Sequence, residues 1–311
     1  MQFQVKGVGI MNDKFKEKPL VTIGMPTYNR PIELEKAIIS AINQTYTNLE
    51  ILISDNCSTE ELVDNLCKKY CSIDKRIKYV RQIQNFGPGK NYEYVFKNAS
   101  GKYHIYLADD DWLSENYIEE CVEFLEQNEG YAIAFGQMNF YNLDYSILRK
   151  CYQVSFDESA REDRIKKYCL TAINSSLSYG VVRIEEAKYM IQNLAERLPE
   201  DWIYMIKILF YGKGKYLSSI SYNALNNGTS KNIDGLKKAF NLPNLTQDNF
   251  WQIMSENIVE SILYDEFYQT RLEKSERISL ALQTNNALIK NDIKPNIISR
   301  IINKLRRIYG K

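Results

Sequence analysis

The hydrophobic pattern in the first part of the chain alternates between short apolar runs and helical repeats. Residues 21–25, 49–54, 77–80 and 103–108 are mostly apolar without polar alternation, as in strands buried on both faces. Apolar residues recur at helical spacing between these runs, first at Leu34, Ala37, Ile38, Ala41 and Ile42. This order predicts an α/β fold with a doubly wound, mostly parallel sheet flanked by helices.

The pattern becomes less regular in the second part of the chain. A strand-like run covers 131–140, but 142–176 are polar and predict a variable insertion that faces the substrate. The composition of 226–232 is that of a loop, which makes it a candidate mobile lid. Further elements are predicted as strands over 177–182 and 215–222, helices over 184–194 and 201–210, and a helical pattern from 246 to the end.

Composition narrows the class of protein. The 311 residues are 44% hydrophobic and 25% charged, which is typical of a globular protein. Forty basic and thirty-nine acidic residues give a net charge of +1, so no overall basic field favours nucleic acid. Six scattered cysteines, without a recognisable signal peptide or a run of ~20 apolar residues, predict a cytoplasmic protein with reduced thiols.

The strongest chemical signal is the acidic triplet Asp109-Asp110-Asp111, directly after the 103–108 run. Ligands of open parallel sheets bind at the carboxyl ends of strands, and three adjacent carboxylates favour a divalent metal that carries a phosphorylated ligand. The alternative is that these acids cap the helix that follows. Ser114 is better placed for that role, so we favour the metal or phosphate interpretation.

Two other polar turns are predicted at the same edge, Thr27–Arg30 and Asp55-Asn56. Together the three turns predict a nucleotide crevice. Neither phosphate-binding glycine motif is present, because 87–90 lack the spacing of a P-loop and no GxGxxG follows the first run.

Four segments, in order, resemble the family 2 glycosyltransferases, which have a GT-A fold. They cover about 19–140, with a weaker match to about 230. The segments are Val-Thr-Ile-Gly-Met-Pro-Thr-Tyr-Asn-Arg (21–30), Gln44-Thr45-Tyr46 before Leu49-Glu50-Ile51, Asp55-Asn56-Cys57-Ser58, and Gly101-Lys102-Tyr103 leading into Asp109-Asp110-Asp111.

This resemblance implies a site for a nucleotide-sugar donor, most commonly a UDP-sugar. Asp110 would be the direct ligand of Mn²⁺ or Mg²⁺ and Asp109 would lie nearer the ribose or the sugar, while Asp111 is a further candidate metal ligand. Asp55 and Asn56 would bind the base, although the family commonly has two aspartates there. The remaining donor-site candidates are Pro26, Thr27, Tyr28, Arg30 and Lys90; for Arg30 and Lys90 a helix-end or surface position is an equal alternative.

The family also uses a carboxylate as the base that deprotonates the acceptor hydroxyl. Asp201 is the residue that we expect in this role, and Glu200 is the second choice. Pro199-Glu200-Asp201 is also a favourable acidic start of a helix, so a purely structural role stays open.

The resemblance implies a metal-dependent, inverting, non-processive glycosyltransferase that transfers one sugar to a glycan or lipid-linked acceptor in bacterial surface polysaccharide synthesis. A non-catalytic sugar-binding protein of the same fold and a sugar-phosphate nucleotidylyltransferase are the alternatives. The expected organisation is a polar extension (1–18), a GT-A domain (19–235) with donor (19–140) and acceptor (141–235) halves, and a helical C-terminal region (236–311).

The C-terminal segment 294–309 combines an apolar face with the basic residues Arg300, Lys304, Arg306 and Arg307. Such a helix suits the inner surface of an anionic membrane, with the protein bound peripherally. Packing on its own domain or on a protein partner is the open alternative.

Overall fold

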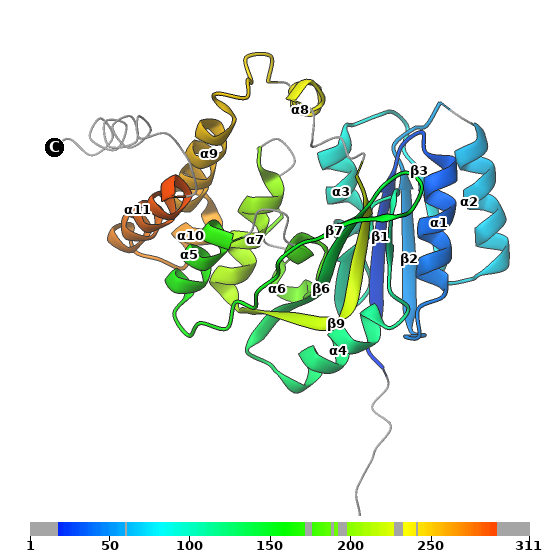
Figure 1. Ribbon diagram of the computed structural model, residues 1–311, viewed down its shortest axis with the longest axis horizontal. Helices are drawn as coiled ribbons and strands as arrows, with labels where there is room; N and C mark the ends of the chain where they lie inside the picture. The colour runs from blue at the N-terminus through cyan, green and yellow to red at the C-terminus, as the bar shows by residue number, and fades with distance from the viewer. Residues whose placement is uncertain are drawn as a thin grey trace, which may run out of the picture.

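A computed structural model describes residues 18–59, 61–171, 176–187, 190–191, 198–226, 233–240 and 242–290. A mixed nine-stranded sheet flanked by helices runs through the molecule in the order β3-β2-β1-β4-β8-β6-β9-β5, with β7 paired to β6 (Figure 1). The strands are β1 (Val21–Thr27), β2 (Leu49–Asp55), β3 (Ile77–Arg81), β4 (Tyr103–Tyr106), β5 (Asp111–Leu113), β6 (Tyr131–Tyr141), β7 (Ile147–Lys150), β8 (Val181–Arg183) and β9 (Lys213–Leu225).

The first four strands form the predicted parallel part of the sheet. β1 pairs with β2 and β4, and β2 pairs with β3, all in parallel. Every residue of β1 and β2 is buried, as their continuous apolar runs predict. β4 ends at Tyr106, two residues before the end of its apolar run. The carboxyl ends of these strands therefore meet at one edge, where the polar turns were expected.

The second part of the sheet is mixed. β8 is antiparallel to β4 and β6, β9 is parallel to β6, and β5 is antiparallel to β9. The sequence analysis did not predict β5, β7 or the helix at 161–171. The Ser114 cap was wrong: Asn116 precedes the helix that follows β5, and the Ser114 hydroxyl accepts a hydrogen bond from Ser221 instead.

Helices cover both faces of the sheet and form a cluster at one end (Figure 1). The first begins at Pro31, a residue suited to the first helical position because it has no N–H to leave unpaired. The helices are α1 (Pro31–Ile42), α2 (Glu61–Ile73), α3 (Pro88–Lys97), α4 (Tyr117–Gln127), α5 (Arg161–Thr171), α6 (Ile184–Ala187), α7 (Glu200–Tyr211), α8 (Ile233–Ala239), α9 (Phe250–Tyr264), α10 (Glu266–Gln269) and α11 (Lys274–Lys290), with a 3₁₀ turn, η1, at Ser176–Tyr179.

The C-terminal helices share a hydrophobic core with the second half of the sheet. Ile262 of α9 and Leu288 of α11 belong to one buried cluster with Ile165 of α5 and Leu209 of α7. A buried ion pair, Lys207–Asp265 at 2.9 Å, ties α7 to the end of α9. Within the part of the chain that the structure describes, no helix combines the length and apolar character that crossing a membrane requires.

Two sequence-based expectations lie largely outside the described residues. The candidate lid is described only at Asn226, and the basic segment 294–309 is not described at all. The predicted helix over 184–194 is found as α6, and 188–189 and 192–197 likewise lie outside the description.

Candidate active site at the carboxyl edge of the sheet

Asp109 is held by the turn that follows β1. Its Oδ2 accepts hydrogen bonds from the Thr27 hydroxyl (2.9 Å) and the Tyr28 backbone N–H (3.3 Å), and its Oδ1 accepts one from Arg30 (3.2 Å). Thr27 and Asp109 are buried, Tyr28 is 39% exposed, and Pro26 is buried within the strand. The structure thus brings the first predicted turn and the acidic triplet into direct contact.

Arg30 bridges two of the three aspartates. One guanidinium nitrogen lies 3.2 Å from Asp109 Oδ1 and 2.7 Å from Asp110 Oδ2. Burial alone would lower the pKa of Arg30, but the two carboxylates raise it above its ordinary value. Burial raises the pKa of Asp109 to about 6; Asp110 adds to this rise and Arg30 opposes it. One cation therefore serves two carboxylates, and the cluster still favours further positive charge.

Asp111 is hydrogen-bonded to β9. Its Oδ2 accepts from the Tyr222 hydroxyl at 2.9 Å, and its Oδ1 accepts from the Leu225 N–H at 3.3 Å. Burial, reinforced by the charge of Asp110, raises the pKa of Asp111 well above the ordinary range. These contacts anchor β5 to β9, and a metal-ligand role for Asp111 stays a prediction.

The chemistry of the triplet fits a divalent cation that is shared with a phosphate ligand. Within the described ranges, no three His, Cys, Asp or Glu side chains form a ready-made metal cluster. Mg²⁺, however, is commonly held by one or two carboxylates together with water and substrate phosphates. Asp110 and Asp109 supply two such carboxylates around a single cation, so these residues would hold the metal jointly with a diphosphate.

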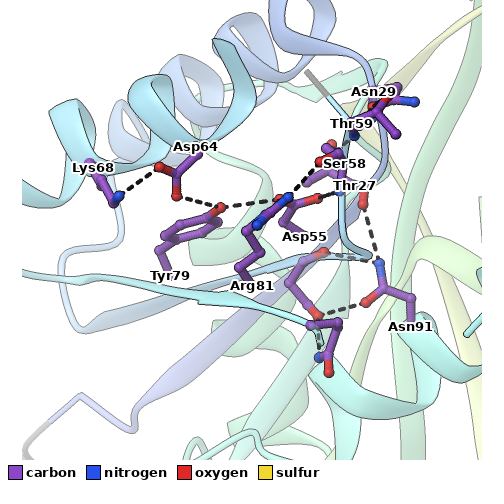
Figure 2. A network of polar contacts seen from close by, with 12 residues as sticks. Thr27, Asn29, Asp55, Ser58, Thr59, Asp64, Lys68, Tyr79, Arg81 and Asn91 are labelled. Atoms are coloured by element: carbon purple, nitrogen blue, oxygen red, sulfur yellow. Dashed lines mark hydrogen bonds and ion pairs between the residues drawn. The ribbon is translucent and has the colours of Figure 1, made fainter. Parts of the chain in front are cut away.

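Asp55 organises the turn after β2 (Figure 2). Its Oδ1 accepts from the Ser58 N–H (2.8 Å), while its Oδ2 accepts from the Tyr79 hydroxyl (3.1 Å) and lies 3.4 Å from Arg81 Nε. Asp55 is fully buried, whereas the Arg81 side chain is 48% exposed beside it. Arg81 was not among the predicted site residues, although the position of Arg81 at the end of a parallel strand was a usable signal. Base binding by Asp55 stays a prediction.

Asn56 fixes the loop that leads into α3. Its amide donates to Asn85 Oδ1 (2.9 Å) and to the Gly87 carbonyl (3.0 Å), and its Oδ1 accepts from the Phe86 N–H (2.9 Å). Lys90 is exposed in the first turn of α3, just after this loop. The predicted contacts of Asn56 with a base and of Lys90 with phosphate stay predictions.

Glu200 and Asp201 begin α7, as expected for the candidate base. Glu200 Oε2 is buried and makes no hydrogen bond. Burial, followed by the charges of Asp201 and Glu93, raises the pKa of Glu200 to about 8. Asp201 is exposed by its surface area, yet burial by the surrounding protein raises its pKa, and the hydrogen bond from Trp202 opposes this rise. Its Oδ1 accepts from the Trp202 N–H (2.9 Å), so part of the helix-start alternative also holds.

Tyr179 lies among acids from both clusters. Its ring stacks on Tyr222 with centroids 4.3 Å apart, and the Tyr222 hydroxyl binds Asp111. Burial raises the pKa of Tyr179, and the charges of Asp111, Asp201 and Asp110 raise it further. The triplet and the start of α7 are thus brought to one region. With 23 tyrosines in the chain, no local signal distinguished Tyr179.

Comparisons with known proteins find relatives among glycosyltransferases. The model of glycosyl transferase family 2 matches residues 22–182. The GalNAc(5)-diNAcBac-PP-undecaprenol beta-1,3-glucosyltransferase of Campylobacter jejuni is 39% identical over 122 residues, which cover 38% of this chain and 38% of that protein. The putative teichuronic acid biosynthesis glycosyltransferase TuaG of Bacillus subtilis is 26% identical over 219 residues, covering 69% and 83% of the two chains.

Solved structures show the same fold. A crystal structure of S. aureus TarS residues 1–349 aligns with a TM-score of 0.58 at 15% identity, covering 88% of this chain and 72% of that TarS fragment. The sequence matches are shorter: the chain spans 44% of an uncharacterized Haemophilus influenzae glycosyltransferase, with 34% identity over 113 residues.

Proposed function

Because the chain belongs to glycosyl transferase family 2, we propose that it is a metal-dependent, inverting glycosyltransferase that moves one sugar from a nucleotide-sugar donor. A glycan or lipid-linked saccharide is the acceptor, in the synthesis of a bacterial surface polysaccharide. The assignment of TuaG to teichuronic acid biosynthesis and that of the C. jejuni enzyme to a PP-undecaprenol-linked saccharide support this class of acceptor. TarS structures that contain UDP-GlcNAc and UDP support a UDP-sugar as donor.

One observation carries the proposal. Arg30 joins Asp109 and Asp110 at the carboxyl edge of the parallel strands, and the charges of both Asp110 and Asp201 raise the pKa of the buried Tyr179. A pair of acids balanced by a cation and a second pair of acids thus lie around one region of the protein. Group transfer from a diphosphate needs such a pair of neighbouring functions, whereas sugar binding alone does not need the second acid.

In the proposed reaction, Asp201 removes the proton from the acceptor hydroxyl. The acceptor oxygen then forms a bond to the anomeric carbon of the donor, and the bond from that carbon to the diphosphate oxygen breaks on the opposite face. The nucleoside diphosphate leaves with the electron pair, and the sugar inverts its configuration. A raised pKa makes the Asp201 carboxylate a stronger base than an ordinary aspartate.

Asp109, Asp110 and Arg30 hold the leaving diphosphate in this scheme. A divalent cation bound with Asp110 supplies positive charge that stabilises the diphosphate as it departs. Arg30 already lies between both carboxylates, so it is positioned to contact a phosphate at the same place. Thr27 and the Tyr28 N–H keep Asp109 oriented.

The proposal is tested by release of nucleoside diphosphate. The protein is incubated with separate UDP- and GDP-sugars and Mn²⁺, with and without EDTA and with a lipid-linked acceptor. We expect metal-dependent release from at least one donor, and a product that carries one added sugar. Absence of release from every donor would favour a non-catalytic binding protein.

A further inference from the structure

The hairpin of β6 and β7, together with the residues just after β7, exposes large apolar side chains. Leu143 is 71% exposed, Ile147 56% and Tyr152 81%, and Leu148 is also exposed. All four residues of β7 are exposed, and among the described residues β7 pairs with β6 alone. Exposed edge strands with several apolar side chains are unusual on a protein that has no partner for them.

The turn of this hairpin is ordered by its own hydrogen bonds. Asp144 Oδ1 accepts from the Ser146 N–H (2.9 Å) and hydroxyl (2.6 Å), and Asn142 donates to the Ser146 hydroxyl (2.9 Å). Tyr145 has a φ of 63°, a left-handed conformation that is unfavourable for a bulky residue. The chain therefore accepts backbone strain at the residue that carries the aromatic ring of the turn.

The hairpin is continuous with an exposed face of α1. Lys36 Nζ lies 3.5 Å from the centre of the Tyr145 ring. Ile32 (72% exposed) and Ile39 (43% exposed) share this face of α1, four residues before and three residues after Lys36. In Figure 1, β7 extends toward α1. We call this surface the rim patch; its apolar members are Ile32, Ile39, Leu143, Ile147, Leu148 and Tyr152.

The rim patch borders the candidate active site. Ile32 is two residues after Arg30, the residue that holds Asp109 and Asp110. On the other side, the ring of Tyr145 lies 5.8 Å from the ring of Trp112, and Trp112 follows Asp111 directly. A surface that bound the rim patch would therefore lie next to the mouth of the site.

Charge identifies the kind of surface that fits. Lys36, Arg149 and Lys150 lie within the patch. Its acids are Asp144, whose oxygen accepts hydrogen bonds from Ser146, and Glu35, which is paired with Lys69. We propose that the rim patch lies on an anionic lipid bilayer, with its apolar and aromatic side chains in the headgroup region and its basic residues facing lipid phosphates. Mixtures of apolar, tyrosine and Lys or Arg side chains are typical of such interfaces.

Membrane binding by the rim patch goes beyond the proposed transferase activity. Only the benefit of this binding rests on the proposed function, because a lipid-linked acceptor would be presented at the membrane. The rim patch contains no residue of the basic segment 294–309. Vesicle binding needs neither donor nor acceptor. Its result therefore distinguishes a failure of the rim patch from a failure of the proposed transferase activity.

The test is co-sedimentation of the full chain with two kinds of vesicle. One contains phosphatidylcholine alone, and the other contains about a third phosphatidylglycerol, whose negative charge creates a surface potential. The test variant is Leu143→Ser with Ile147→Ser. Its matched control is Leu62→Ser with Ile73→Ser on α2, where both side chains are 64% exposed. A third variant replaces Arg300, Lys304, Arg306 and Arg307 by Ala.

We expect wild type and the α2 control to bind anionic vesicles, and the hairpin variant to bind at least about tenfold more weakly. All variants should keep the same nucleotide affinity. The proposal is overturned if the hairpin variant binds vesicles as wild type does. This holds also if the C-terminal variant is the one that loses binding. It is equally overturned if wild type ignores vesicles and light scattering shows a dimer that Leu143→Ser with Ile147→Ser dissociates.

Discussion

The molecule contains two acidic clusters near one another that differ in how their charge is balanced. Asp109 and Asp110 share the cation Arg30, and Asp109 accepts three hydrogen bonds. Glu200 has a buried oxygen without a hydrogen bond, and its neighbours Asp201 and Glu93 are also acidic. The pKa of Asp109 is accordingly raised to about 6 and that of Glu200 to about 8.

This difference separates two kinds of function. A cluster with a fixed cation and donors holds its charge in place, which suits binding of a metal and a diphosphate. A buried carboxylate oxygen that accepts no hydrogen bond, as in Glu200, makes ionisation costly and proton uptake easy, which suits an acceptor of protons. Substitutions in each cluster can test this assignment of binding to one cluster and proton transfer to the other.

The largest effect is expected for Asp201→Asn. An amide cannot accept the proton of the acceptor hydroxyl, so transfer should fall by roughly two to four orders of magnitude while donor affinity is retained. Steady-state kinetics would show a loss in kcat with little change in the donor KM. Glu200→Gln is the matched control, with an expected loss of less than about tenfold. If the two variants exchange these outcomes, Glu200 is the base.

Arg30→Gln should destabilise the cation-balanced cluster. Removal of the guanidinium leaves Asp109 and Asp110 to repel each other, and we expect Tm to fall by about 3–6 °C at pH 7.5. Mn²⁺ should restore most of this loss, because a bound cation replaces the missing charge. Lys68→Gln, at an exposed pair with Asp64, is the control and should change Tm by less than about 1 °C. A loss of Tm that Mn²⁺ leaves unchanged would argue against a shared cation site.

Glu200→Gln should have a smaller, pH-dependent effect on stability. The pKa of Glu200 is about 8 in the fold and 4.5 ordinarily, so the unfolded chain releases this proton first. Stability that is present below about pH 4.5 is then lost as pH rises to about 8. The variant lacks this loss and should have a Tm about 2–4 °C above wild type at pH 9, with no difference at pH 4. Exposed Glu123→Gln is the control; equal behaviour of the two variants would contradict the burial of Glu200.

The parallel half of the fold and its acidic edge could be predicted from sequence because their signals are local. Continuous apolar runs define β1 and β2, and a polar turn follows each. β5 could not be predicted, since Asp111–Leu113 is three residues long and is a strand only through pairing with β9. β7 was missed because its four residues are all exposed, so no buried face shows in its sequence. α5 was missed because it is mostly polar in sequence, although Ile165, Tyr168 and Cys169 are buried.

The contacts of the site residues likewise include some that the sequence predicts and some that it does not. The contact of Asp109 with Thr27 follows from the meeting of two strand ends, which topology alone predicts. The contacts of Asp55 Oδ2 with the side chains of Tyr79 and Arg81 could not be foreseen, because those side chains come from the neighbouring strand β3. Their geometry depends on packing that no spacing rule contains.

The most direct test of the two-cluster account is calorimetric titration of UDP into wild type, Asp110→Asn and Asp201→Asn, with Mn²⁺ and with EDTA. If the triplet binds and the α7 acids transfer protons, Asp201→Asn will bind UDP with Mn²⁺ as wild type does. Asp110→Asn will show only the weak binding that wild type shows with EDTA. Unchanged Mn²⁺-dependent binding by Asp110→Asn, or its loss in Asp201→Asn, would contradict the account.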